Sequence, residues 1–254
     1  MRDGTRAAGL VEALGLACAP ELVAIVGGGG KSSLMFALAR SLPGRVVMTT
    51  TTRIFAAQLS RAAAVCTLAD ENWEERLDAF DSSLLVVGGT EGDRAVGVPP
   101  ELPAEILAHP GVDWVVVEAD GSRMLPVKAP APHEPVIPDE TSLLIPVVGI
   151  DALSRPIREV AHRPERVSTI TGLASEETLT PEALAALLTS SQGGLKDAPQ
   201  AARVAVLINK VESSSQREAA RRVAHCILRE PRVERVAIGA LRGRLSSEWE
   251  ICSL

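Results

Sequence analysis

Short apolar runs recur along this chain, and stretches with apolar residues every three or four positions separate them. A continuous apolar run bounded by turn residues is typical of a strand buried on both faces, whereas the wider spacing is typical of an amphipathic helix. The apolar runs predict strands at residues 23–26, 45–49, 65–68, 83–87, 113–118, 143–148, 203–209 and 233–238. The amphipathic stretches predict helices at residues 5–16, 34–39, 72–80, 101–109, 164–171, 181–189 and 213–229.

This alternation of strands and helices predicts an α/β fold with a mostly parallel sheet and helices on both faces. Apolar residues make up 46% of the chain but aromatic residues only 2%, so the core must consist of Val, Leu, Ile and Ala. Such a composition suits parallel strands covered by helices. We expect residues 1–254 to form a single domain, with residues 1–20 as an N-terminal helical extension.

A glycine-rich turn lies between the first long strand and the next helix, and it reads Gly27-Gly28-Gly29-Gly30-Lys31-Ser32-Ser33. Glycines let the backbone approach a ligand closely, and the free amides at a helix N-terminus bind phosphate. Lys31 adds a positive charge, and the Ser32 hydroxyl suits Mg²⁺. The turn therefore predicts a P-loop NTPase-like domain that uses Mg²⁺ with ATP or GTP.

The standard phosphate-loop pattern G-x-x-x-x-G-K-[ST] is incomplete, because Ile25 takes the place of its first glycine. The shorter G-x-x-G-K-S resembles the ATP loop of the Mur ligase group. The alternative is a flexible glycine turn that binds nothing. We favour phosphate binding, because Gly-Lys-Ser directly between an apolar strand and a helix is a demanding coincidence.

Two carboxylates mark the end of the apolar run at residues 113–118, with Glu118 at its last position and Asp120 two residues later. A carboxylate beyond a strand end can coordinate nucleotide-bound Mg²⁺, directly or through water. Many buried strands end in Asp or Glu, so the two carboxylates alone are weak evidence for a metal site. Their combination with the glycine loop makes the prediction stronger. We predict a magnesium site made of Ser32 and Asp120, with Glu118 as the alternative carboxylate.

Polar residues at two further places are candidates for catalysis. Residues 49–52 and Arg53 leave the strand alternation at the carboxyl end of the second long strand, where ligands of open α/β sheets bind. High β propensity is the other explanation for the threonines. His133 lies in the proline-rich segment 124–138, which is either a surface connection or a loop that presents His133 to the phosphates. No water-activating residue stands out, and the predicted catalytic set is Lys31, Thr52, Arg53, Asp120 and His133.

The strand predicted at residues 203–209 ends in Asn209-Lys210-Val211-Glu212. This stretch resembles the Asn-Lys-x-Asp element of GTPases, in which the acid pairs with two N–H donors of guanine and the lysine covers the ring. Glu212 is one methylene longer than Asp, which leaves guanine selectivity open. We expect Asn209, Lys210 and Glu212 to hold a purine base, with GTP bound at least as well as ATP.

A formal net charge of −6 argues against a nucleic-acid partner, which would require a basic stripe. One local basic excess, expected to be a solvated face or else an anion site, comprises Arg229, Arg232, Arg235, Arg242 and Arg244. No apolar segment approaches the length of a membrane span, and no membrane partner is expected. The four cysteines are far apart and form no C-x-x-C pair, which favours free thiols in the cytoplasm.

Taken together, these motifs resemble the YqeC family. The likeness extends over residues 22–239 and also includes His133-Glu134-Pro135 and Gly193-Gly194-Leu195-Lys196. Ser32, where threonine is common, and Glu212 depart from the family pattern. Members are described as accessory proteins for selenium-dependent molybdenum hydroxylases. The resemblance implies a P-loop domain that acts in maturation or insertion of a selenium-containing molybdenum cofactor, with a molybdenum hydroxylase or its cofactor precursor as partner.

The sequence thus favours a Mg²⁺-dependent protein that binds a purine nucleoside triphosphate, either an NTPase or a nucleotide-dependent transferase. Two alternatives remain open. One is a non-catalytic, nucleotide-gated carrier or insertion chaperone for the cofactor, which would bind its client without turnover. The other is an ATP-dependent ligase, suggested by the short phosphate loop.

Overall fold

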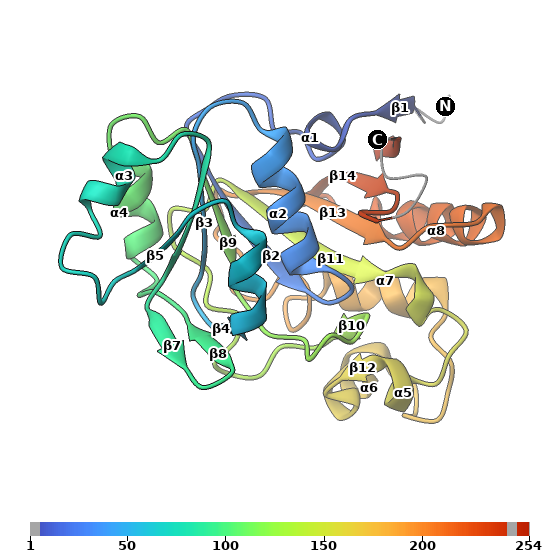
Figure 1. The fold of residues 1–254 in the computed structure, drawn as a ribbon. Coiled ribbons are helices and arrows are strands. Elements are labelled where there is room, and N and C mark those ends of the chain that lie inside the picture. Colours follow the sequence, from blue (N-terminus) through green and yellow to red (C-terminus); the bar gives the residue numbers. More distant parts are fainter. Residues whose placement is uncertain (1–5, 243–247, 254) are drawn as a thin grey trace.

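The computed structural model describes residues 6–242 and 248–253, and its centre is a ten-stranded sheet (Figure 1). Neighbouring strands from β14 to β5 pair in parallel, whereas β15 pairs antiparallel with both β14 and β1. The strand order across the sheet is β1 (Arg6–Ala8), β15 (Trp249–Ser253), β14 (Val233–Ile238), β13 (Arg203–Asn209), β11 (Leu143–Gly149), β2 (Glu21–Gly27), β9 (Trp114–Glu118), β3 (Val46–Thr50), β6 (Ser83–Val87) and β5 (Val65–Thr67). The predicted mixed α/β architecture with a mostly parallel sheet is confirmed.

Helices cover both faces of the sheet, because successive side chains of each buried strand point to opposite sides. Leu22, Ala24 and Val26 of β2 pack on one side, and Val23 and Ile25 pack on the other. The first side is covered by α3 (Glu75–Ala79), α4 (Leu102–Ala108), α5 (Ile157–Val160), α6 (Pro164–Thr171), α7 (Pro181–Thr189) and α8 (Ser214–Ile227). The second side is covered by α1 (Leu10–Ala13) and α2 (Lys31–Ser41).

The N-terminal segment differs from the helix predicted at residues 5–16. Residues 1–5 lie outside the described part of the chain, residues 6–8 form β1, and only residues 10–13 are helical. The strand forms because these residues pair with β15 from the other end of the chain, a contact that local periodicity does not encode. The helix stops early because Gly15 adopts φ +75°, which continues no right-handed helix.

Two small sheets and two 3₁₀ helices complete the described fold. The predicted connection at residues 91–100 contains part of a hairpin that β4 extends into a three-stranded antiparallel sheet. A short parallel pair joins the segment after β9 to the segment before α6. These elements are β4 (Arg53–Phe55), β7 (Gly89–Glu91), β8 (Arg94–Val96), β10 (Val127–Lys128), β12 (Ala161–His162), η1 (Ala56–Arg61) and η2 (Ile150–Ala152).

Strand β2 is the switch point of the sheet. After β2 the chain builds β3, β5, β6 and β9 on one side of it, and then β11, β13 and β14 on the other. In open α/β sheets ligands bind at the carboxyl ends of the strands beside such a point, which here places a ligand against the glycine loop. No helix in the described residues is long and apolar enough to cross a membrane.

Candidate functional site

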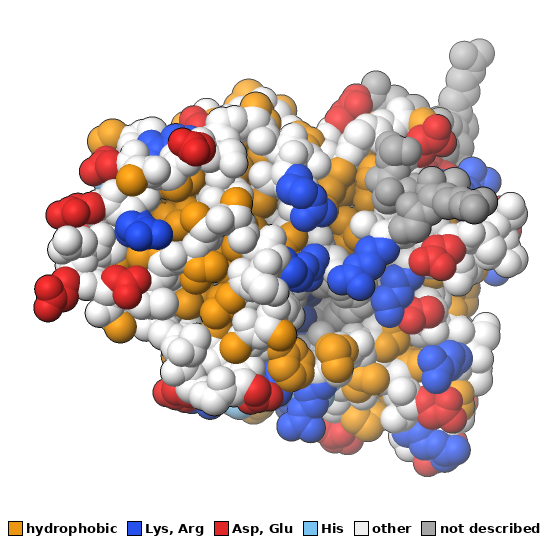
Figure 2. Space-filling view, in the orientation of Figure 1, with side chains coloured by type: hydrophobic (Ala, Val, Ile, Leu, Met, Phe, Trp, Pro, Cys, Tyr) orange, Lys and Arg blue, Asp and Glu red, His pale blue; other side chains and the backbone are white. Residues whose placement is uncertain are grey.

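A cavity of about 900 Å³ opens at the carboxyl edge of the sheet. Figure 2 shows Lys and Arg side chains gathered around a hollow on this face of the molecule. The cationic side chains that line the cavity are those of Lys31, Arg53, Arg61, Arg94, Arg123, Arg163, Lys210 and Arg242. The carboxylates among its described lining residues are Glu118, Glu134 and Glu212. This excess of positive charge favours an anionic ligand.

Three positions of the glycine loop have a backbone conformation that favours glycine. Gly27, Gly29 and Gly30 have φ values of +96°, +73° and +131°. A Cβ atom on Gly27 would lie 2.5 Å from the Val147 carbonyl oxygen, and one on Gly29 would lie 2.1 Å from the Gly149 amide nitrogen. The loop is therefore wedged against the end of β11.

The amides of the loop divide into two groups. The first three already have acceptors within the fold, and the pairs are Gly27 with the Asp120 carboxylate, Gly28 with the Val147 carbonyl and Gly29 with the Leu125 carbonyl. The next four donate to no acceptor in the described part of the chain, and they belong to Gly30, Lys31, Ser32 and Ser33. Free amides at the start of α2 can bind an anion, and the helix dipole adds to their attraction.

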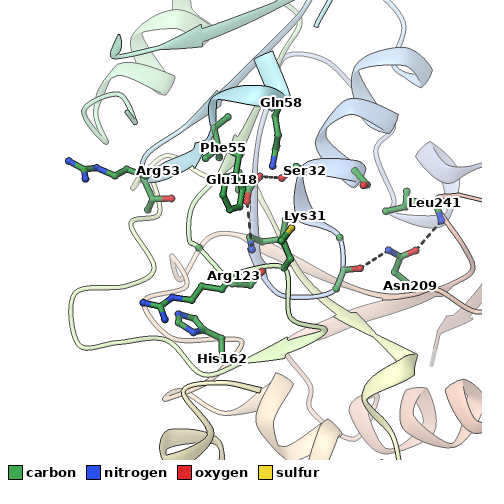
Figure 3. A pocket seen from close by; sticks show the side chains of 18 of the residues that line it. Lys31, Ser32, Arg53, Phe55, Gln58, Glu118, Arg123, His162, Asn209 and Leu241 are labelled. Carbon is green, nitrogen blue, oxygen red and sulfur yellow. Dashed lines mark hydrogen bonds and ion pairs between the residues drawn. The ribbon is translucent and has the colours of Figure 1, made fainter. Parts of the chain in front are cut away.

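Lys31, Ser32 and Glu118 converge beside these amides (Figure 3). The Ser32 hydroxyl donates to Glu118 Oε2 over 2.6 Å, and Lys31 Nζ lies 3.7 Å from Glu118 Oε1. Burial raises the pKa of Glu118, against the opposing effects of the Lys31 charge and the Ser32 hydrogen bond. The charged form of this buried carboxylate would be stabilised by a divalent cation bound beside Ser32.

Asp120 has a different environment from Glu118 and does not line the cavity. It is 2% exposed, accepts the Gly27 amide at 3.0 Å, and pairs with Lys31 at 3.3 Å and Lys128 at 3.0 Å. These contacts fix the start of the glycine loop. The structure therefore places Glu118, and not Asp120, beside Ser32 at the cavity wall, and the magnesium role of Asp120 stays a prediction.

A line of buried charges continues from Asp120 into the proline-rich segment. Lys128 Nζ lies 2.8 Å from Glu134 Oε2, which also accepts from Arg163 at 2.8 Å. Burial alone would raise the pKa of Glu134, but hydrogen bonds and charges from Lys128 and Arg163 lower it to about 2. The segment is thus held rigidly, and it places His133 at the cavity.

Asn209 ties the glycine loop to the chain beyond β14. Its Nδ2 donates to the Gly29 carbonyl over 2.7 Å, and its Oδ1 accepts the Leu241 amide at 2.9 Å (Figure 3). Lys210 pairs with Asp151 at 2.8 Å, and the exposed Glu212 also lines the cavity. The structure thus brings the predicted base-binding residues to the β13 end of the same cavity.

The predicted catalytic candidates Thr52 and Arg53 line the cavity at the β3 end. Arg53 is exposed, and its guanidinium pairs with Glu91 at 2.8 Å. Of the predicted site residues, all but Asp120, Gly27 and Gly28 line this cavity.

Sequence reasoning missed several residues that line the cavity. Only Arg242 carried a signal, as a member of the local basic excess that was expected to be surface; Arg244 lies outside the described residues. The others come from the small sheets and connections, and they include Phe55, Gln58, Arg61, Arg94, Arg123, Met124, His162 and Arg163. Their positions depend on the small sheets, the 3₁₀ helix η1 and the turn at Arg123, which local sequence patterns did not predict.

These observations define a mixed α/β protein with a cationic cavity against a glycine loop at the switch point of its sheet. A family model described as "YqeC protein" matches residues 23–165. "Uncharacterized protein YqeC" of Escherichia coli (strain K12) is 34% identical over 205 residues, which are 79% of this chain and 80% of that protein. The chain therefore belongs to the YqeC family, as its motifs predicted.

Proposed function

We propose that this protein binds a purine nucleoside triphosphate with Mg²⁺ and uses it as an NTPase or a nucleotide-dependent transferase. The observation that carries the proposal is the convergence of free amides, Lys31 and the Ser32–Glu118 pair at the start of α2. The amides and Lys31 would hold the β and γ phosphates. Lys31 now donates to the Gly27 carbonyl over 2.8 Å, so it would turn from that acceptor toward the phosphates.

The residues beside the loop fit Mg²⁺ in nucleotide-bound form. Ser32 and Glu118 offer hard oxygen ligands, and the nucleotide phosphates and water would supply the rest. Among the described residues no group of three or more His, Cys, Asp or Glu could hold a metal ion by itself. When bound, Mg²⁺ would neutralise charge that develops on the phosphates.

The purine base fits at the β13 end of the cavity. Asn209 is buried and hydrogen-bonded to the Gly29 carbonyl and the Leu241 amide, so it would shape the site, whereas the Glu212 carboxylate is exposed and able to accept from guanine. We therefore propose GTP or ATP as the nucleotide, with the two N–H donors of guanine as the distinguishing contact.

The family resemblance supports a biological setting for this activity. We propose that the nucleotide serves maturation of a selenium-containing molybdenum cofactor for molybdenum hydroxylases in the cytoplasm. The partner would be such a hydroxylase or its cofactor precursor.

Calorimetric titration with ATP, GTP and CTP, each with and without Mg²⁺, tests the proposal. We expect Ser32→Ala to weaken Mg²⁺-dependent binding about tenfold or more, because it removes a metal ligand and the partner of Glu118. Ser41→Ala, at the other end of the same helix and outside the cavity, is the matched control and should change affinity less than about twofold. Absence of triphosphate binding to the folded parent protein would refute the proposal. A separate assay of phosphate release would distinguish an enzyme that turns over the nucleotide from a non-catalytic carrier.

A further inference from the structure

The cavity extends beyond the space that the proposed nucleotide would fill, and this inference rests on that proposed function. Three strand spacings separate the base end at β13 from Glu118 on β9, a distance of about 14 Å. The proposed nucleotide would lie over this distance, along the glycine loop. Another part of the cavity lies past Glu118, beside β3 and the small three-stranded sheet. Its total volume of about 900 Å³ is near the top of the usual range for small-molecule sites.

One wall of this further space comes from β4, η1 and β8. The Arg94 guanidinium stacks on the Phe55 ring at 3.8 Å from its centroid, and both residues line the cavity. Gln58 lies on the same wall, and its buried Oε1 atom has no hydrogen-bond partner among the described residues. The wall therefore combines a flat aromatic surface with an unsatisfied hydrogen-bond acceptor, which could receive an N–H or O–H group from the uncharged part of a ligand.

The opposite wall carries a cation in an unusual backbone conformation. Arg123 and Met124 are exposed and have φ values of +49° and +63°, which bulky side chains rarely adopt. Met124 is 80% exposed, and Arg123 forms no hydrogen bond or ion pair within the described chain. Backbone strain of this kind concentrates at functional sites.

His162 lies beside Arg123 on this wall (Figure 3). Burial, followed by the charges of Arg163, Lys128 and Arg123, lowers the pKa of His162 to about 4. The imidazole is therefore neutral near pH 7 and offers hydrogen bonds without adding charge.

The carboxylates near this space are already engaged. Glu118 is paired with Lys31 and Ser32, and Glu134 is paired with Lys128 and Arg163. Glu212 lies at the base end, on the segment that follows β13. Arg94 lies 3.6 Å from the Asp93 carboxylate, whereas Arg123 has no ion-pair partner among the described residues. Because the described residues that line this part of the cavity offer no free carboxylate, Arg123 leaves room for an anion from outside.

We propose that this part of the cavity binds a second substrate that carries an oxyanion, a carboxylate or a phosphate, as the acceptor of the γ-phosphoryl group. In the transfer, a bond forms between the acceptor oxygen and the γ-phosphorus. The bond from that phosphorus to the β,γ-bridging oxygen breaks, and its electron pair leaves with the nucleoside diphosphate. The acceptor oxygen is already anionic, so no proton has to be removed and no general base is needed. This agrees with the carboxylates of Glu118 and Glu134, which are paired with other side chains.

The test is a titration of inorganic phosphate, and separately of benzoate, into protein saturated with Mg²⁺ and the β,γ-imido analogue of the bound nucleotide. We expect saturable binding of at least one probe at millimolar concentration, weakened about tenfold or more by Arg123→Ala. Arg222→Ala, which removes a surface arginine of α8 outside the cavity, is the matched control and should leave binding unchanged. Binding of phosphate alone would identify a phosphorylated acceptor, and binding of benzoate alone a carboxylic acid.

Two results would overturn the inference while leaving the nucleotide proposal intact. In one, neither probe binds the nucleotide-loaded protein. In the other, Arg123→Ala weakens nucleotide and probe equally, or weakens neither, so that Arg123 does not serve a separate subsite. Failure of the proposed function is distinguishable, because the nucleotide analogue itself would then not bind in the first step.

Discussion

Glu118 and Asp120 are two residues apart in sequence, yet their carboxylates have separate environments. Glu118 pairs with Ser32 at the cavity wall, whereas Asp120 is enclosed by the Gly27 amide and two lysines. Removing the charge of Glu118 should therefore affect metal binding, whereas removing the charge of Asp120 should affect the stability of the loop. The sequence pattern treats them as equivalent.

We predict that Glu118→Gln weakens Mg²⁺-dependent nucleotide binding about tenfold or more, with little loss of stability, since burial already disfavours its charge. Asp120→Asn should instead lower the free energy of unfolding by about 3 kcal/mol, because Lys31 and Lys128 each lose a buried partner. Urea unfolding and nucleotide titration with and without Mg²⁺ measure both effects. The reverse pattern would assign the metal to Asp120.

A second prediction at the residue scale concerns acid. The folded-state pKa of His162, about 4, lies below its ordinary value of 6.5, so between these values only the unfolded chain takes up the proton. Stability should therefore fall as the pH drops from about 6.5 to 4. The low pKa of Glu134, about 2, extends the loss below its ordinary value of 4.5.

Denaturant unfolding at several pH values checks this slope. His162→Asn should flatten it between about pH 6.5 and 4 and leave the lower window unchanged. His225→Asn, on α8 outside the cavity, is the control. An unchanged slope in His162→Asn would show that other groups cause the acid sensitivity.

At the scale of elements, the sequence predicted long segments well and short ones poorly. The strands 83–87 and 233–238 and the helices 164–171 and 181–189 have the predicted bounds, because prolines or polar residues delimit strong local patterns. The three-residue strands β1, β4, β7 and β8 were missed. Strands β1 and β4 exist only through pairing with segments far away in the chain, and β7 and β8 form a hairpin too short to show an alternating pattern.

The difference between long and short segments also explains which residues of the site could be predicted from the sequence. Lys31, Glu118 and Asn209 follow or end long strands, so the parallel topology alone brings them to one edge. Arg123 and Phe55 reach the cavity from a strained turn and a short edge sheet. Their contribution requires knowledge of the tertiary fold.

Asn209 connects β13, the glycine loop and the segment after β14, and it supports a prediction at this scale. Asn209→Ala should weaken ATP and GTP equally, about tenfold, and destabilise the fold by about 1–3 kcal/mol, because it leaves the Gly29 carbonyl and the Leu241 amide without their partner. Glu212→Ala should instead narrow the ratio of GTP to ATP affinity and leave stability unchanged. Calorimetry with both nucleotides and urea unfolding measure these effects. Equal effects of the two variants would contradict separate roles.

At the scale of the whole molecule, the cavity joins segments from both halves of the sheet. Residues after β2, β3, β9 and β13 all line it, so a ligand there contacts both sides of the switch point. Any ligand that binds only the folded chain stabilises the whole of it by mass action.

We therefore predict a thermal shift with Mg²⁺ and nucleotide. At a ligand concentration one hundred times Kd the gain is about 2.7 kcal/mol, which corresponds to about 5–10 °C for a protein of this size. Differential scanning calorimetry of the parent protein and Ser32→Ala, with Mg²⁺ present throughout, measures it. A shift of the same size in Ser32→Ala at equal nucleotide concentration would contradict the proposed metal ligand.

The engaged amides of Gly27, Gly28 and Gly29 have a consequence for the energetics of recognition. Fixing the backbone of one residue costs about 1–2 kcal/mol of conformational entropy, and glycine loses more freedom than any other residue. Here Asp120, Val147 and Leu125 hold the first half of the loop in place without a ligand. An anion therefore binds a loop that is already ordered. The entropic cost of ordering the loop lowers the stability of the folded chain and does not weaken the binding of the anion.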